Sequence, residues 1–117
     1  MIRQLLIVDD DLSVRRALTR WARVCGYEAT CFDSGHAFLS ATIPDGTCLI
    51  LDLALPDLDG GDVKRQLIAR GRDLPTIFIS ALTDEKIARS LAGIESPRVL
   101  RKPFDASQLS IAIAAAA

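Results

Sequence analysis

Short apolar runs alternate along this chain with longer segments in which apolar residues recur every three or four positions. The runs have the length and composition of β-strands, and they lie at residues 4–8, 27–32, 48–51, 76–79 and 99–100. The run from Leu49 to Leu51 has no polar interruption, which is typical of a strand buried on both faces of a sheet. The intervening segments have the spacing of amphipathic helices.

Helix start and stop signals support the same division. Asp11 or Ser13 is available to cap the first helix, which Gly26 ends, and Thr83 begins a helix with an acidic first turn. The segment 105–108 fits a capping box. Five strand and helix pairs, with crossovers of a dozen or more residues, require a parallel sheet with helices on both faces. We therefore expect an α/β doubly wound fold of five parallel strands and five helices, as a single domain spanning residues 1–117.

The composition is that of an ordinary globular domain. The chain has 117 residues, of which 50% are hydrophobic and 25% charged, and its net charge is −1. Bulk charge gives no reason to expect a nucleic-acid or membrane partner, and Arg65, Arg70 and Arg72 are interpreted as a solvated face. No apolar run reaches the roughly 20 residues of a membrane span, and the N-terminus lacks the layout of a signal peptide. We expect a cytoplasmic protein.

The chain has three cysteines, Cys25, Cys31 and Cys48, which are widely spaced along the sequence. Disulfide frameworks use even numbers of cysteines, and zinc sites use closely spaced pairs. We therefore interpret all three as small buried apolar side chains.

Polar residues follow four of the five predicted strands. They are Asp9 and Asp10, Asp52, Ser80, and Lys102. Because parallel strands end at the same edge of a sheet, where open α/β folds bind ligands, we expect these side chains to meet. Two carboxylates about 4 Å apart repel by about 4 kcal/mol at an effective dielectric constant near 20. A cation must offset this repulsion, and hard oxygen ligands favour Mg²⁺ or Mn²⁺.

The same edge is suited to a phosphoryl group. The Lys102 ammonium provides a positive charge for one phosphoryl oxygen, and the Ser80 hydroxyl can donate a hydrogen bond to another. No histidine or cysteine lies among the strand-end residues. A nucleophile at this edge must therefore be a carboxylate, and aspartyl phosphates are established covalent intermediates.

Four motifs, spread in order over the whole chain, resemble those of the receiver domain of bacterial two-component response regulators. They are Asp9-Asp10, Asp52 followed by Leu-Pro-Asp-Leu-Asp-Gly, Ser80-Ala81, and Lys102-Pro103-Phe104. The resemblance implies a flavodoxin-like sheet with the strand order 2-1-3-4-5 and a cis bond between Lys102 and Pro103. It also implies that the domain is not an enzyme in the ordinary sense, since it catalyses only its own phosphorylation and dephosphorylation.

The resemblance further implies a role for each acid at the strand ends. Asp52 would be the phosphoacceptor, which takes a phosphoryl group from a histidine kinase or a histidine phosphotransfer protein in a Mg²⁺-dependent step. Asp10, Asp52 and the backbone carbonyl of Ala54 would ligate the metal, with Asp9 acting mostly through water. Ser80 would turn toward the new phosphate, and Lys102 would contact it.

In such receivers the phosphate switches the face formed by helix four, strand five and helix five, which docks a partner or forms a homodimer. The family often has an aromatic switch residue three positions before the lysine, and here that position is Val99. We therefore expect Ser80 to draw the following loop toward the phosphate, with the segment 81–95 as the element that moves. In the family, the residues two after the phosphoacceptor and two after the hydroxyl flank the path of water to the phosphate. Here they are Ala54 and Leu82, and neither side chain can orient water. Slow loss of the phosphoryl group is expected.

Three other functions are weighed against this one. An aspartate-nucleophile phosphohydrolase would need a second acid two residues after the nucleophile, where this chain has Ala54. An FMN carrier of the flavodoxin type would need a phosphate-binding loop of glycines and hydroxyls after the first strand, where this chain has three aspartates. A receiver that docks without phosphorylation stays open, although all the acids, the hydroxyl and the lysine are present.

The segment 66–71 and the following Leu74-Pro75 resemble FixJ-type receivers, which precede a helix-turn-helix DNA-binding domain. The sequence is therefore interpreted either as an excised N-terminal domain or as a stand-alone receiver.

Overall fold

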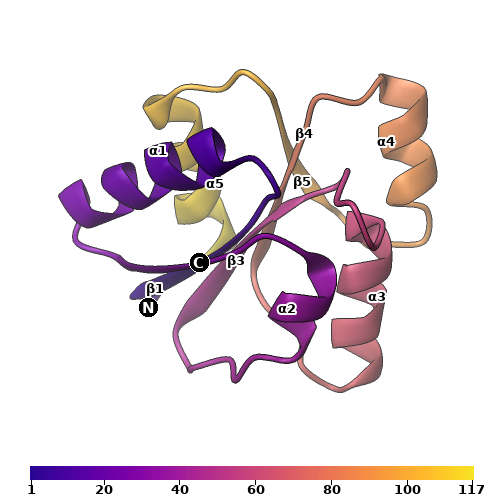
Figure 1. Ribbon diagram of the computed structural model, residues 1–117, viewed down its shortest axis with the longest axis horizontal. Coiled ribbons are helices and arrows are strands. Elements are labelled where there is room, and N and C mark those ends of the chain that lie inside the picture. The colour runs from indigo at the N-terminus through magenta and orange to yellow at the C-terminus, as the bar shows by residue number, and fades with distance from the viewer.

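The computed structural model describes residues 1–117 as five strands that alternate with five helices (Figure 1). The strands are β1 (Gln4–Val8), β2 (Glu28–Phe32), β3 (Thr47–Asp52), β4 (Thr76–Ser80) and β5 (Arg98–Arg101). The helices are α1 (Leu12–Val24), α2 (Gly35–Leu39), α3 (Gly60–Ala69), α4 (Asp84–Ser90) and α5 (Ala106–Ala116). All neighbouring strands are parallel, and their order is β2-β1-β3-β4-β5. The predicted doubly wound, flavodoxin-like fold is confirmed.

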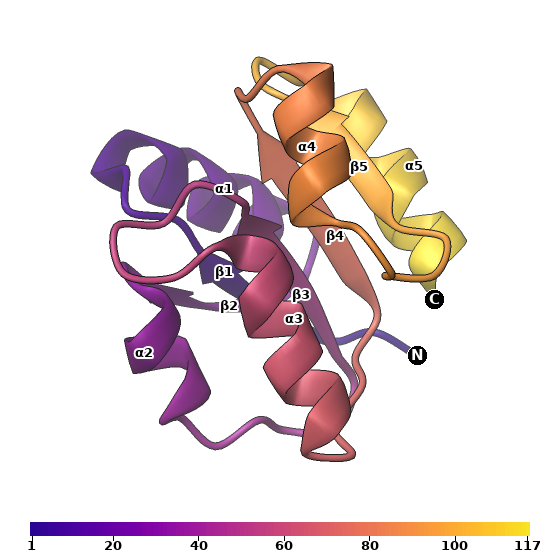
Figure 2. The ribbon, with the colours of Figure 1, turned by 90° about the vertical axis from the view of Figure 1, so that its right-hand side faces the viewer.

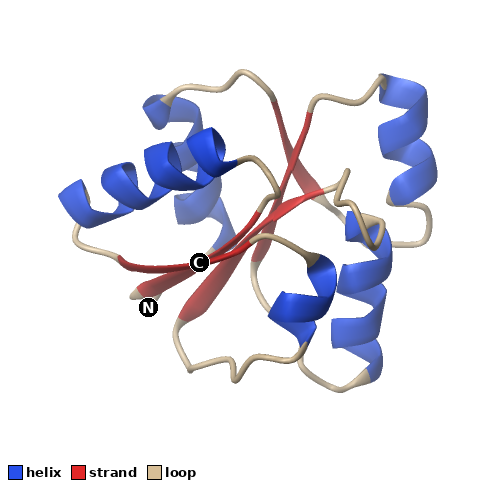
Figure 3. Cartoon of the chain, in the orientation of Figure 1, coloured by secondary structure: helices blue, strands red, loops and turns tan.

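Side chains of the central strands alternate between two apolar cores, one on each face of the sheet. Leu5 and Ile7 of β1 face the core that α1 and α5 cover, whereas Leu6 and Val8 face the core that α2, α3 and α4 cover (Figure 3). Every residue of β3 is buried, from Thr47 to Asp52, as expected for a strand with helices on both sides. The sheet therefore holds the end of β3 at the rim of both cores.

The predicted caps form at the ends of the helices. The Asp11 side chain accepts a hydrogen bond from the Ser13 amide at the start of α1, and Gly26 has a positive φ of 85° after its end. Thr83 caps α4, and Asp105 and Gln108 form the expected capping box of α5. Helix α4 ends at Ser90.

Helix α3 meets the carboxyl end of α4 in a close polar junction. The Ser90 hydroxyl donates to the Asp59 carboxylate at 2.5 Å, and the Arg65 guanidinium donates to the carbonyls of Ser90 and Ala92 at 2.7 Å each. A Cβ atom on Gly61 would overlap the Ser90 carbonyl oxygen. Glycine at position 61 therefore allows the two backbones to approach.

Polar side chains on α3 and just beyond it make contacts that the sequence did not predict. Lys64 is buried, and its Nζ donates to Asp73, the Leu74 carbonyl and Thr76 at 2.6–2.9 Å. The arginines interpreted as a solvated face, Arg65, Arg70 and Arg72, keep part of their surface exposed, and each also donates to backbone carbonyls of neighbouring segments. A long stem lets these side chains cross the surface to distant acceptors.

The interpretation of the cysteines was right for Cys48, which is fully buried, and wrong for the other two. Cys25 follows the last turn of α1 and is exposed. Cys31 is exposed on the edge strand β2, with its Sγ 3.1 Å from the Thr19 Oγ1. An edge strand lacks a neighbour on one side, so an apolar residue there gains less burial than in the middle of the sheet.

None of the helices is both long and apolar enough to span a bilayer.

The buried contacts of Lys64 lead to a stability prediction. Lys64→Met keeps the length of the side chain and removes its charged hydrogen bonds, which we expect to lower the free energy of unfolding by about 1–3 kcal/mol. Lys86→Met, on exposed α4 surface, is the matched control. Urea unfolding measures both, and a change in Lys64→Met no larger than that of the control would contradict the prediction.

Candidate functional site

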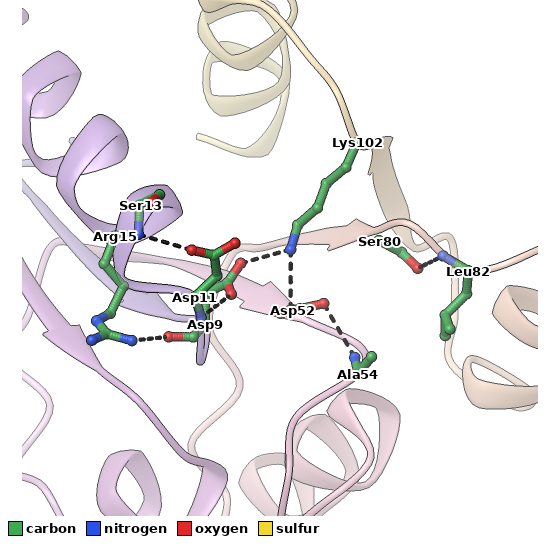
Figure 4. Close-up of polar contacts among 9 residues, drawn as sticks. All are labelled: Asp9, Asp11, Ser13, Arg15, Asp52, Ala54, Ser80, Leu82 and Lys102. Carbon is green, nitrogen blue, oxygen red and sulfur yellow. Dashed lines mark hydrogen bonds and ion pairs between the residues drawn. The ribbon is translucent and has the colours of Figure 1, made fainter.

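Three strands end in the same local turn. The side chains of Asp9, Asp52 and Ser80 each accept a hydrogen bond from the backbone N–H two residues later, with distances of 2.9, 3.1 and 2.9 Å (Figure 4). Aspartate and serine favour such turns because their short side chains reach the backbone of the next residues. The turn lets the chain leave the sheet while a polar side chain stays at its edge.

The register of the sheet brings two of these residues together. Val8 pairs with Leu51, so Asp9 and Asp52 leave adjacent strands side by side. Both are buried, with 0% and 4% of their surface exposed. Asp10 is exposed, and carboxylate oxygens of Asp9, Asp10 and Asp52 lie within 4.8 Å of one another. The predicted cluster of three acids therefore forms.

Lys102 joins this cluster from the end of β5. Its backbone N–H donates to the Ser80 carbonyl at 2.8 Å, which extends the pairing of β4 and β5 by one residue. Its Nζ lies 2.8 Å from Asp9 Oδ2 and 3.2 Å from Asp52 Oδ2 (Figure 4). One ammonium therefore bridges the two buried carboxylates. The bond between Lys102 and Pro103 is cis, as the resemblance implied.

Burial and charge shift the pKa values of this bridged pair. Burial raises the pKa of Asp52; the Ala54 amide opposes the shift, the negative charge of Asp9 adds to it, and Lys102 opposes it. The pKa of Lys102 is raised, because its contacts with Asp9 and Asp52 outweigh the effect of its burial. The lysine is therefore held in its charged form between the two acids.

Ser80 lies at the same edge but does not contact the acids. The residue is buried, and Figure 4 shows its hydroxyl directed to the Leu82 amide, on the side away from Asp52. Ala54 lies two residues after Asp52 and donates its N–H to the Asp52 carboxylate. The structure thus brings Asp9, Asp10, Asp52 and Lys102 together and keeps Ser80 beside them.

The loop after Asp52 is held by two further aspartates. Asp57 accepts hydrogen bonds from the amides of Gly35 and His36 at the start of α2, and these bonds lower its pKa. Asp59 caps α3 through the Gly61 amide. Both have the turn and cap functions expected of aspartates in a loop.

Sequence reasoning missed Arg15. Its guanidinium donates to the Asp9 carbonyl at 2.8 Å and so fixes the turn that carries the acids (Figure 4). The one signal for this contact is position, because Arg15 lies one turn into α1 and the strand end lies just before that helix.

The donor set fits a hard divalent cation. Three carboxylates face one ammonium, so two negative charges lack a partner within the cluster. The available donors are carboxylate oxygens, which suit Mg²⁺ and Mn²⁺ and do not suit softer metals. Asp10 is exposed and could complete the coordination from the solvent side.

Comparisons with known proteins identify the family of this chain. The family model described as Response regulator receiver domain matches residues 5–114. Nodulation protein W of Bradyrhizobium diazoefficiens is 38% identical over 113 residues, which cover 94% of this chain and 49% of that protein. Response regulator protein TodT of Pseudomonas putida is 38% identical over 111 residues, with 94% and 49% covered. The chain thus spans about half the length of these curated relatives.

Solved structures give the same result. The FixJ-N crystal structure superimposes with a TM-score of 0.87 and 27% identity, covering 99% of this chain and 94% of that chain. The response regulator StyR superimposes with a TM-score of 0.82 and 31% identity, covering 99% and 59%. Taken with the match of the family model over residues 5–114, these similarities show that the chain belongs to the response regulator receiver domain family.

Proposed function

We propose that this chain is a phosphoacceptor receiver, in which Asp52 takes a phosphoryl group from a histidine kinase or a histidine phosphotransfer protein in the cytoplasm. Receiver domains of response regulators are signalling domains that interact with histidine kinases. The observation that carries the proposal is the bridge from Lys102 to Asp9 and Asp52 inside a cluster of three acids. A nucleophile, a cation for phosphoryl oxygens and a set of metal ligands then occupy one edge of the sheet.

The reaction requires little beyond these residues. A carboxylate oxygen of Asp52 forms a bond to phosphorus while the bond from phosphorus to the donor nitrogen breaks, and the donor imidazole leaves with the electron pair. Bound Mg²⁺ or Mn²⁺, held by Asp10, Asp52 and the Ala54 carbonyl with Asp9 through water, would offset negative charge on the carboxylates and the phosphoryl oxygens. Lys102 then donates to a phosphoryl oxygen.

The switch would begin at Ser80. For its hydroxyl to donate to the phosphate, it must turn away from the Leu82 amide, which then loses its acceptor. The loop 81–83 would follow, and with it Asp84 at the start of α4. Asp84 pairs with Arg101, the last residue of β5. New charge-assisted hydrogen bonds of about 1.5–3 kcal/mol each are enough to invert two arrangements that differ by a few kcal/mol.

The output would be the face formed by α4, β5 and α5, which lie together at one end of the molecule (Figure 2). In this proposal, that face docks a partner or a second copy of the chain when Asp52 is phosphorylated. Relatives that are twice as long include the Transcriptional regulatory protein PrrA of Mycobacterium tuberculosis, 37% identical over 109 residues. We therefore propose that the domain controls a transcriptional output.

The direct test is incubation with acetyl phosphate and Mg²⁺, followed by intact mass. We expect one phosphoryl group to be gained by the protein and none by Asp52→Asn. Removal of the metal with EDTA should prevent the gain. An unmodified wild-type protein would favour a docking receiver instead, and steady release of phosphate from acetyl phosphate would favour a phosphohydrolase.

The phosphoryl group is expected to be lost slowly. Neither Ala54 nor Leu82 has a polar side-chain atom with which to position an attacking water. Ala54→Asn supplies an amide at that position and should shorten the lifetime of the phosphorylated form. Decay in Mg²⁺, followed by intact mass, measures both proteins; a wild-type lifetime of seconds would refute the expectation.

The raised pKa of Asp52 leads to a pH-dependent stability difference. A group whose pKa is higher in the folded state stabilises the fold at low pH, and this contribution is lost as the pH rises through the folded pKa. Metal-free Asp52→Asn should therefore unfold at a higher temperature than the wild type at pH 7. The difference in unfolding temperature should shrink as the pH is lowered toward the pKa of a free aspartic acid side chain.

Differential scanning calorimetry at several pH values measures this effect. Asp45→Asn, at a highly exposed position, is the control for removal of one negative charge. A wild-type protein that is more stable than Asp52→Asn at pH 7 without metal would show that the contact with Lys102 outweighs burial.

A further inference from the structure

Three arginines on the outer flank of α1 lack a partner in this structure. Arg16, Arg20 and Arg23 are exposed, and none of them takes part in an ion pair. Helix α1 contains no acidic residue from Leu12 to Val24, although the whole chain has a net charge of −1. Positive charge is therefore concentrated on this helix.

This flank forms one wall of a groove of about 480 Å³, which also includes Thr19 and Cys31. Cys31 belongs to β2, over which α1 packs. β2 is the first strand of the sheet and pairs only with β1. The outer backbone groups of an edge strand are open to pairing with an added strand. The groove is therefore lined by a row of cations and reaches the edge strand at Cys31.

We propose that this groove binds an extended acidic segment of a partner protein, which pairs with the free edge of β2 and places its carboxylates against the arginines of α1. A helix rises about 1.5 Å per residue, so Arg20 lies about 6 Å along the axis from Arg16 and about 4.5 Å from Arg23. In an extended chain, side chains on one side repeat about every 6.7 Å. Acidic residues at alternate positions of the segment are slightly farther apart than the arginines, and the long arginine side chains can reach across this difference.

The surroundings of the groove favour a short segment over a nucleic acid. Exposed acids lie at both of its ends, namely Asp10 and Asp11 before α1, Glu28 at the start of β2, and Asp33 after it. A long polyanion running across the groove would meet these carboxylates and be repelled, because like charges oppose binding. A segment of a few residues has its charges only where the arginines lie.

The test uses a fluorescein-labelled peptide with the sequence Thr-Glu-Val-Glu-Val-Glu-Thr and blocked ends. We expect saturable binding by fluorescence anisotropy, weakened at least tenfold when glutamine replaces each glutamate of the peptide. The double variant Arg20→Gln, Arg23→Gln should also bind at least tenfold more weakly. Arg3→Gln with Arg98→Gln removes the same charge outside the groove and should bind like the wild type. Circular dichroism checks that each variant is folded.

Cysteine reactivity provides an independent reading of where the peptide binds. Cys31 lines the groove, whereas Cys25 is exposed outside it. We expect saturating peptide to slow the alkylation of Cys31 by iodoacetamide and to leave that of Cys25 unchanged. Absence of binding, equal weakening in both double variants, or equal protection of the two thiols would overturn the proposal. A DNA duplex that competes as well as the peptide at equal salt would also overturn it.

Discussion

The buried carboxylates of Asp9 and Asp52 impose the main constraint on this molecule, because the fold holds two acidic side chains next to each other, away from solvent, at the carboxyl ends of β1 and β3. Only the Lys102 ammonium bridges them within the protein, at 2.8 and 3.2 Å. Removal of the Lys102 ammonium would leave both carboxylates without compensation, which costs far more than the net worth of the contact. The same excess of negative charge suits a divalent cation, which the proposed phosphoryl transfer would need to offset the charge of the incoming group. The free site therefore has an excess of negative charge, which the cation required by the proposed reaction would reduce.

The backbone makes this cluster possible with few residues. Asp9, Asp52 and Ser80 end three strands with side chains that accept from the amide two positions later. Each turn fixes a polar group at the sheet edge without a long loop, and Arg15 and Asp57 secure the adjacent segments. The positions of the reactive groups therefore depend on the parallel register of the strands, which the two apolar cores enforce.

Local patterns predicted the parts of the fold that depend on local physics. The apolar run before Asp52 identified the central strand, and the caps at Thr83 and Asp105 located two helix starts within a residue. For α1, Asp11 was one of two candidate caps. The acids at the strand ends followed from the topology. The direction of the Ser80 hydroxyl and the burial of Lys64 could not be predicted, because each depends on acceptors brought together only by the tertiary structure. For Cys31, composition suggested burial, but the strand order placed it at an edge.

The junction between α3 and α4 has a mechanical consequence for any signal that passes through α4. At its carboxyl end, α4 is held by hydrogen bonds to Asp59 and Arg65, and Gly61 allows the two backbones to lie in close contact there. At its first turn, α4 is held by the ion pair of Asp84 with Arg101. Release of the first turn alone leaves the far end anchored. In the proposed switch, α4 would then pivot about Ser90 rather than slide along the sheet, and the largest displacement would occur at its first turn, just after the end of β4.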